Sequence, residues 1–423
     1  MGKYRTEPKQ AFFFLGYGIF VLLVLCRTTF FYQYIMGGTF KAILGLCVCI
    51  AVFGEIVCGR GTRPMIAGLL VCFCYIALAI FVKATIYLVL ASTVIFIFCS
   101  RDIPFKRTAA FSACILAAAF AVVVLSSRIG IIKDYVDTAG GRVRHYLGFL
   151  YALYPSTVLM NIIMLAVYVR REMIKWAELI LFAAAALIIF KLTNSRLAMI
   201  LSLFVILFAI FMKLWPYFLV KKNILKRIAA LFYLILAAGS LIISIKYNEN
   251  IAWQARINDV LSARLELQHE AMEEYGFSIF GQEINDNGNG LTAEGKKSKD
   301  IEKNGYFYID NVYIQWYTKN GIVFFIVMLL VMTAISFRSI AYDRQGYLSV
   351  MLALMAVFCL IQDSILYIHF NTFLLCTGNM LLNHENDIMH IGHRKRAISV
   401  RSHGEAIFPG SSEPICEKMS IRL

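Results

Sequence analysis

A short polar stretch near residue 140 gathers basic residues that suit the binding of a diphosphate. Arg142 and Arg144 stand two residues apart, and His145 follows directly. Residues at this spacing point the same way only in extended chain, so both guanidinium groups could reach one ligand. An arginine stays charged and donates two parallel hydrogen bonds to a phosphate. His145 can exchange a proton near neutral pH, or alternatively hydrogen-bonds within its own loop.

Two further arginines occur in short polar segments of the same kind. Arg128 opens the segment that contains the residues above, and Arg196 follows Asn194 and Ser195 in a tight turn. A cation at the start of a helix opposes the helix dipole, so an anionic ligand beside Arg196 would explain it. Anchoring to lipid phosphates is the alternative interpretation for each residue taken singly.

A third group of candidates lies on a stretch with helical spacing of its apolar residues. Arg256 and Arg264 would be separated by about 80° around a helix axis, so both could line one edge. Gln268 and His269 follow one turn later and could bind sugar hydroxyls. A solvated or lipid-facing edge is the alternative, and we leave it open for Arg256.

Tyrosines surround one carboxylate ahead of a later apolar run. Asp310 is the strongest candidate for orienting or deprotonating a hydroxyl group, and Asn311 could hydrogen-bond the same group. Tyr308 and Tyr313 flank this pair; interfacial aromatic residues usually form a membrane belt, but they also stack on sugar faces. Asp363, from another turn, is a second and weaker carboxylate candidate.

An unusually apolar chain must position these residues. Of its 423 residues, 60% are hydrophobic and 16% are charged, and the mean hydropathy is +0.71. Globular domains carry about 25% charged residues, so a soluble protein of this composition would expose large apolar patches. Runs of about 20 apolar residues, enough for a transmembrane helix, recur along the chain. The first is followed by Arg27 rather than by a cleavage site, so we expect a membrane helix there and not a signal peptide.

The sequence therefore predicts an all-α polytopic integral membrane protein with about twelve transmembrane helices. The split between the third and fourth spans rests only on a short hinge at Lys83. The predicted spans lie near residues 11–32, 42–59, 65–82, 84–99, 108–127, 148–169, 177–193, 197–214, 228–245, 320–337, 346–362 and 365–383.

Basic residues in alternate short loops orient these spans. They include Lys3, Arg5, Lys9, Arg60, Arg63, Arg101, Lys106, Arg107, Arg170, Arg171, Lys175, Lys221, Lys222, Lys226, Arg227, Arg338, Arg344, Arg394, Lys395 and Arg396. The positive-inside rule makes these loops cytoplasmic, so both termini are expected inside and the chain in a cytoplasmic (inner) membrane. Topology and anionic lipid then explain most of the formal charge of +15, and we expect no nucleic acid partner.

The predicted organisation follows from these spans. It consists of a cytoplasmic N-terminus (1–10), nine spans (11–245), a large extracytoplasmic loop (246–319), three spans (320–383) and a basic cytoplasmic tail (384–423). The loop begins with a predicted amphipathic helix over 251–275. Its polar stretch 285–304 is expected to be mobile, and the tail to be disordered.

Several kinds of chemistry leave no signature in this sequence. It contains no P-loop, nucleophile elbow or HExxH motif. The 11 cysteines form no CxxC pair and no metal-ligand spacing, so we expect neither disulfides nor a bound metal. The predicted spans hold almost no carboxylate near mid-membrane, which weakens the case for an ion-coupled transporter.

Four stretches, taken in order and on one predicted membrane face, give the chain a family resemblance. They are Arg142-Val-Arg-His-Tyr-Leu-Gly-Phe149, Thr193-Asn-Ser-Arg-Leu-Ala198, Leu261-Ser-Ala-Arg-Leu265 with Ile279-Phe-Gly-Gln282, and Ile309-Asp-Asn-Val-Tyr313. Over about residues 10–385 the chain resembles the Wzy-type polymerases of oligosaccharide repeat units, which serve capsule, exopolysaccharide and O-antigen pathways. The resemblance implies a GT-C-like architecture with one long outward loop.

The resemblance also implies a glycosyl transfer that needs no metal and no cofactor. A glycan on undecaprenyl diphosphate would be the donor, the terminal hydroxyl of a new lipid-linked repeat unit the acceptor, and undecaprenyl diphosphate the leaving group. Arg142, Arg144, Arg196 and Arg264 would bind the donor diphosphate and stabilise its developing charge. A chain-length regulator and a flippase of the same pathway would be partners.

Two alternative functions stay open. An O-antigen-type ligase would use the same diphosphate site and move a finished glycan to a different acceptor. A flippase or transporter of lipid-linked oligosaccharides would also have many spans, but we would expect charged residues inside its cavity and short loops throughout.

Overall fold

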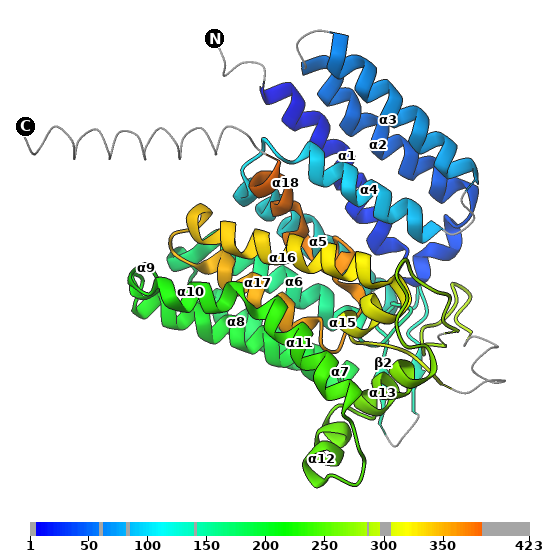
Figure 1. Ribbon diagram of the computed structural model, residues 1–423. Helices are drawn as coiled ribbons and strands as arrows, with labels where there is room; N and C mark the ends of the chain where they lie inside the picture. Colours follow the sequence, from blue (N-terminus) through cyan, green and yellow to red (C-terminus); the bar gives the residue numbers. More distant parts are fainter. Residues whose placement is uncertain are drawn as a thin grey trace, which may run out of the picture. The chain divides into compact units, whose positions relative to one another are not determined.

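A computed structural model describes residues 6–58, 62–81, 85–138, 142–285, 287–296 and 306–382, and its first compact unit ends at Leu382. Within these residues the chain is mainly helical, with one two-stranded hairpin (Figure 1). The hinge at Lys83, the basic residues Lys3, Arg5 and Arg60, part of the polar stretch 285–304 and the tail 384–423 lie outside them.

The first half of the chain supplies the longest helices. They are α1 (Thr6–Cys26), α2 (Gly38–Cys58), α3 (Thr62–Phe81), α4 (Thr85–Cys99), α5 (Phe105–Arg128), α6 (Tyr154–Arg170), α7 (Trp176–Thr193) and α8 (Arg196–Leu214). Two short 3-10 helices, η1 (Phe30–Tyr34) and η3 (Arg171–Met173), lie among them. Strands β1 (Val136–Asp137) and β2 (Arg144–His145) form an antiparallel hairpin in which Asp137 pairs with Arg144.

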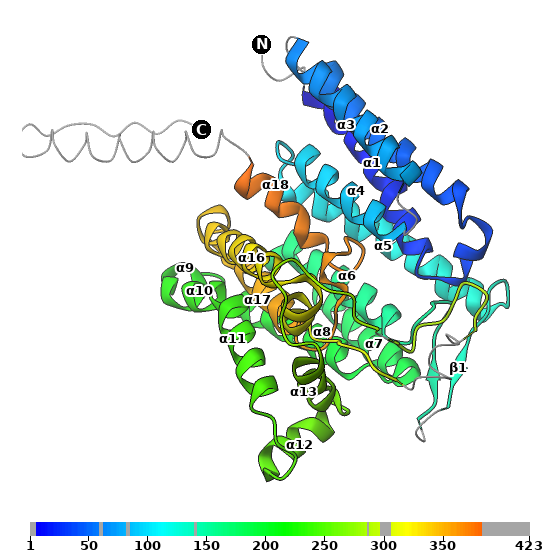
Figure 2. The ribbon, with the colours of Figure 1, turned by 45° about the vertical axis from the view of Figure 1, so that its right-hand side comes forward.

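The second half contains shorter helices and one long one. These are α9 (Phe218–Lys221), α10 (Asn223–Ala230), α11 (Phe232–Ile245), α12 (Ala252–Val260), α13 (Arg264–Glu274), α15 (Val312–Gln315), the π-helical turn η4 (Trp316–Asn320), α16 (Ile322–Tyr342), α17 (Tyr347–Phe358), η5 (Ser364–Leu366), η6 (Thr372–Leu375) and α18 (Cys376–Leu381). In Figures 1 and 2, α12, α13 and the β1–β2 hairpin lie at one end of the helices.

By length and composition the chain is an all-α, multi-pass membrane protein. Six described helices are long and apolar enough to cross a membrane, and a seventh span is added if α10 and α11, bent by 44°, count as one. The predicted spans 65–82, 84–99 and 346–362 coincide with shorter apolar helices. The count of twelve spans stays a prediction.

Several predicted spans differ from the described helices; the span 148–169, for example, is helical only from Tyr154. The predicted span 365–383 is divided, because Asn371 lies between η5 and η6 and its Nδ2 donates to the Ile365 carbonyl at 3.0 Å. The helical part Thr372–Leu381 covers only about 15 Å at 1.5 Å per residue. The first predicted span, 11–32, ends early because α1 stops at Cys26, and Arg27 therefore lies just beyond the helix.

Helix α6 is buried along most of its length and supports the site. Its residues from Pro155 to Leu165 are all buried, and it packs against α5, α7, α8 and α17. Because α6 is buried on all sides, its polar residues Ser156, Thr157 and Asn161 included, it belongs to the core of the protein. This helix therefore fixes the position of the segment that leads into it, Leu150 to Leu153.

The stretch Ile279-Phe-Gly-Gln282 has a structural role at the start of α16. The backbone amide of Ile322 donates to the Ser278 carbonyl at 2.9 Å, which satisfies a helix amide that otherwise lacks a partner. Gly321 has φ +92°, and a Cβ on it would lie 2.4 Å from the amide nitrogen of Gly281. Only glycine permits this approach.

Candidate functional site

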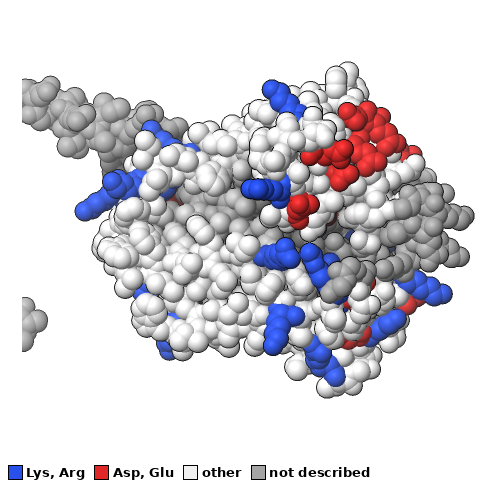
Figure 3. Space-filling model, turned by 90° about the horizontal axis from the view of Figure 1, so that it is seen from below, with Lys and Arg blue, Asp and Glu red and all other residues white. Residues whose placement is uncertain are grey.

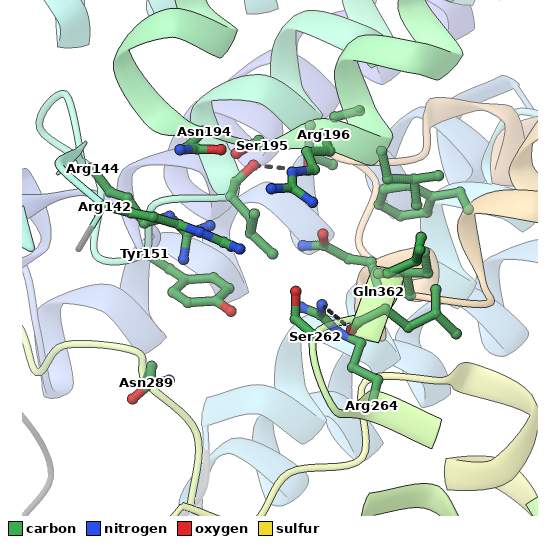
Figure 4. Close-up of a pocket in the computed structure, with 18 of the residues that line it drawn as sticks. Arg142, Arg144, Tyr151, Asn194, Ser195, Arg196, Ser262, Arg264, Asn289 and Gln362 are labelled. Atoms are coloured by element: carbon green, nitrogen blue, oxygen red, sulfur yellow. Dashed lines mark hydrogen bonds between the residues drawn. The ribbon is translucent and has the colours of Figure 1, made fainter. Parts of the chain in front are cut away.

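Segments far apart in the sequence enclose a cavity of about 230 Å³. Four of the predicted site residues line it: Arg142, Arg144, Arg196 and Arg264. In Figure 4, Arg142 and Arg144 come from the hairpin segment, Arg196 from the start of α8 and Arg264 from the start of α13. The structure therefore brings together in space the arginines that the sequence predicted as one diphosphate site.

The hairpin positions Arg144 against the end of helix α7. Its Nε donates to the carbonyl of Thr193, the last residue of that helix, at 3.2 Å. The carbonyl end of a helix carries partial negative charge and favours a cation. Arg142, just before strand β2, is exposed and reaches the same cavity.

The turn between α7 and α8 directs helix amides at the cavity. Asn194 ends α7 in the left-handed conformation (φ +56°), which asparagine tolerates better than most residues. Ser195 precedes α8 but gives it no side-chain cap, and its Oγ donates to the Ala152 carbonyl at 3.3 Å. The first residues of α8, which line the cavity, therefore offer uncapped amides, and such a helix start binds anions.

A strained turn between α12 and α13 presents Arg264. Ser262 and Ala263 both adopt positive φ, at +58° and +63°, which is uncommon for residues other than glycine. Asn258 holds the turn, because its Oδ1 accepts the amides of Leu265 and Glu266 at 3.1 Å each. The helix predicted over 251–275 is thus two helices, and Arg264 begins the second.

An ion pair with Asp310 fixes the side chain of Arg264. The Nε of Arg264 donates to Asp310 Oδ2 at 2.7 Å, and its Nη1 donates to the Leu261 carbonyl at 3.1 Å. Burial raises the pKa of Asp310, and the attraction of Arg264 opposes that shift. Asp310 is buried and absent from the cavity wall, so in this arrangement it orients the arginine.

The cavity holds more positive charge than its neighbours neutralise. In the part of the chain that the structure describes, no carboxylate forms an ion pair with Arg142, Arg144 or Arg196. In the face drawn in Figure 3, acidic side chains gather in one region while basic ones are spread over the rest. Clustered like charges repel one another, so an anionic ligand would stabilise this arrangement.

A second carboxylate lies next to the cavity wall. Tyr308 donates to Asp363 Oδ2 at 2.5 Å, and Asp363 directly follows Gln362, which lines the cavity. The pKa of Asp363 is raised to about 6 in total. Burial is the main cause, the hydrogen bond from Tyr308 acts in the opposite direction, and the charge of Asp310 raises the pKa further. Burial also raises the pKa of the cavity residue Tyr306, so its phenol remains a neutral donor.

Two predicted residues of the hairpin segment are held outside the cavity. His145 Nδ1 lies 2.9 Å from Asp134 Oδ2, and Arg128 lies 3.6 Å from the same oxygen. Asp134 Oδ1 also accepts the amide of Leu147, at 2.8 Å. This network folds the loop, and neither His145 nor Arg128 lines the cavity.

Four further predicted residues lie away from the cavity. Asn311 caps α15 and donates to Gln268 and Ser240, both at 3.1 Å, so it uses its amide inside the protein. Tyr313 is buried and donates to the Ala356 carbonyl at 2.8 Å. His269 Nδ1 bonds the Ser244 carbonyl at 2.8 Å, and Arg256 is exposed on α12.

The cavity also includes residues that the sequence did not single out. Tyr151, Asn289 and Gln362 are such residues, and Ser262, which lies in the quoted stretch Leu261–Leu265, also lines the cavity (Figure 4). Tyr151 stands two residues after the stretch that ends at Phe149, so a longer reading of that stretch would have included it. Gln362 lies at the edge of an apolar run, and the signal beside it in the sequence is Asp363, the weaker of the two carboxylate candidates.

No protein-family model, curated protein or solved structure matches this chain. Within the described ranges, no group of three His, Cys, Asp or Glu side chains is placed to hold a metal ion.

Proposed function

We propose that this chain is a membrane glycosyltransferase that polymerises oligosaccharide units carried on undecaprenyl diphosphate, as the Wzy-type polymerases do. The observation that supports the proposal is the convergence of four arginines and the start of α8 on one cavity. Guanidinium groups and helix amides are the donors that phosphate oxygens accept best. A diphosphate headgroup would supply the negative charge that the cavity lacks.

The proposal carries a topology with it. The cavity would open at the outer face of the cytoplasmic membrane, both termini would be cytoplasmic, and the helices would form a GT-C-like assembly of about twelve spans. A chain-length regulator and a flippase of the same pathway would be partners.

The reaction would be a displacement at the anomeric carbon of the donor sugar. The acceptor hydroxyl would form the new C–O bond as the bond from that carbon to the diphosphate breaks, and undecaprenyl diphosphate would leave. Negative charge then builds on the leaving diphosphate, so arginines that strengthen their bonds at that moment lower the barrier. Asp310 would serve by keeping Arg264 in place.

The acceptor hydroxyl must also lose a proton. We assign this step to Asp363: it is not part of the cavity wall, but it directly follows the cavity residue Gln362 in the chain, among the described residues it is not held by an arginine as Asp310 is, and its raised pKa of about 6 is near the working pH. A base is most effective when its pKa is close to that pH. Asp363→Asn should therefore abolish transfer.

The test is an assay of purified full-length protein in detergent with synthetic undecaprenyl-diphosphate repeat units. The wild-type protein should produce a ladder of products, whereas Arg142→Ala and Arg264→Ala should leave single units. Each charge-assisted hydrogen bond contributes about 1.5–3 kcal/mol, so losses of about ten- to one-hundred-fold or more are expected. Arg256→Ala, on the same loop but outside the cavity, is the matched control.

The outcomes separate the competing functions. A single new product on a foreign acceptor would indicate the ligase. Movement of the lipid across vesicle membranes without any glycosidic bond would indicate the flippase. A full ladder from both cavity variants would reject the site.

A further inference from the structure

A second cavity, of about 250 Å³, adjoins the arginine cavity. Tyr151 lines the first cavity and Tyr154 lines the second, and their rings meet edge to face with centroids 5.4 Å apart. In the same way Asn289 lines the first cavity and Leu291 the second. One aromatic pair and one short loop segment therefore separate the two cavities.

The backbone around the second cavity is firmly held. The amide of Leu150 donates to the Thr28 carbonyl at 2.9 Å, and the amide of Leu291 donates to the Leu150 carbonyl at 2.8 Å. The Phe30 amide adds a bond to the Gly148 carbonyl at 2.9 Å. Three chain segments distant in sequence are thus joined into one wall, as a preformed binding site requires.

Basic side chains accompany this cavity as well. Arg27, directly after α1, lines it, and among the described residues no carboxylate pairs with Arg27. Lys133 lies nearby, since its Nζ is 3.4 Å from the position of a Cβ built on Gly295, in the same loop segment as Leu291.

We propose that the second cavity binds the diphosphate of the second lipid-linked oligosaccharide, the acceptor, through Arg27. This inference rests on the proposed function, in which both substrates carry the same headgroup. The bond to the donor diphosphate breaks, so several arginines around it lower the barrier. The acceptor diphosphate stays intact, so a single arginine that binds substrate and transition state equally is sufficient.

The test counts lipid diphosphates directly by native mass spectrometry of the full-length protein with undecaprenyl diphosphate. The wild-type protein should bind two molecules, Arg27→Gln one and Arg142→Ala one. Leu291→Trp, which fills the second cavity without touching Arg27's charge, should also bind one. Arg256→Gln, exposed and outside both cavities, should bind two.

Kinetics provide the second readout. In the ladder assay, Arg27→Gln should raise the KM for the acceptor about ten-fold and leave the KM for a pre-extended donor within two-fold. Arg142→Ala should instead lower kcat and raise the KM for the donor.

The possible failures can be told apart. A wild-type protein that binds no undecaprenyl diphosphate contradicts the proposed function itself. A wild-type protein that binds one molecule, unchanged in Arg27→Gln and Leu291→Trp but lost in Arg142→Ala, overturns the second site and leaves the proposed function standing. Equal KM changes for donor and acceptor in Arg27→Gln would overturn it too.

Discussion

The guanidinium group of Arg264 contacts several partners at the same time. Two of its nitrogens are engaged by Asp310 and by the Leu261 carbonyl, while the side chain still lines the cavity. A planar fork with five donors can meet these demands together, whereas the ammonium group of lysine is a single point charge on a flexible stem. The chemistry of this position therefore depends on arginine itself and not on positive charge alone.

Arg264→Lys should accordingly lower ladder formation by at least about ten-fold, because one or more charge-assisted hydrogen bonds are lost. The measurement is the rate of dimer formation from synthetic repeat units at equal amounts of protein. Arg256→Lys, also on the 246–319 loop but exposed and outside the cavity, should keep the wild-type rate. Full activity of Arg264→Lys would show that charge alone is enough.

The pair of Tyr308 and Asp363 makes a prediction about pH. The donated hydrogen bond stabilises the carboxylate, so Tyr308→Phe should raise the pKa of Asp363 above about 6. Because the base acts only when deprotonated, the acidic limb of kcat should move to higher pH, with kcat falling tenfold per pH unit below the pKa. Tyr34→Phe, an exposed tyrosine, should leave the profile unchanged. An unshifted limb in Tyr308→Phe would remove Asp363 from the mechanism.

The arginines were predictable from the sequence, but their partners were not. Arginines in short polar segments between apolar runs stand out in the sequence, and Arg142, Arg144 and Arg196 were found in this way. In the sequence His145 is an equally good candidate, but its Nδ1 is hydrogen-bonded to Asp134, eleven residues earlier in the chain. Such pairing depends on how the loop folds back, which no spacing rule specifies.

At the scale of elements, the turn between α12 and α13 decides which arginine reaches the cavity. An uninterrupted helix would have put Arg256 and Arg264 near one edge. The left-handed residues Ser262 and Ala263 break it, and only Arg264 lines the cavity. Neither serine nor alanine is typical of that conformation, so the sequence carried no sign of the break.

Asn258 should therefore matter for activity although it does not line the cavity. Asn258→Ala removes the acceptor for two amides at the start of α13, which should cost about 0.5–2 kcal/mol and release Arg264 from its position. We expect a lower melting temperature and a several-fold lower rate of ladder formation. Asn258→Asp keeps the accepting oxygen but sets a second carboxylate beside Glu266 Oε2, to which Asn258 Nδ2 donates at 3.3 Å. The double variant Asn258→Asp/Glu266→Gln keeps the accepting oxygen without that repulsion, so it should behave nearly as the wild type. Equal losses in Asn258→Ala and in the double variant would argue against capping as the cause.

At the scale of the whole molecule, composition was enough for the class of fold but not for the number of spans. Apolar runs predicted helices wherever long ones are found, because lipid leaves a chain few other ways to satisfy its backbone. They could not show that the run 365–383 is divided at Asn371, since a helix buried among other helices and a lipid-facing one have similar composition. Nor could they show that Arg27 lies beyond α1.

Helix α8 supplies the means to test the orientation of the whole assembly. Arg196, at the start of α8, lines the cavity. The helix has 19 residues and is therefore about 28 Å long at 1.5 Å per residue, and Lys221 and Lys222 follow its other end. The positive-inside rule makes the lysine end cytoplasmic, so the cavity end should face outward. An epitope inserted after Gly130, where a Cβ would meet open space, should bind antibody on intact spheroplasts. An epitope after Lys222 should bind only after permeabilisation, and the reverse pattern would place the arginines on the side where no outward-facing lipid-linked glycan could reach them.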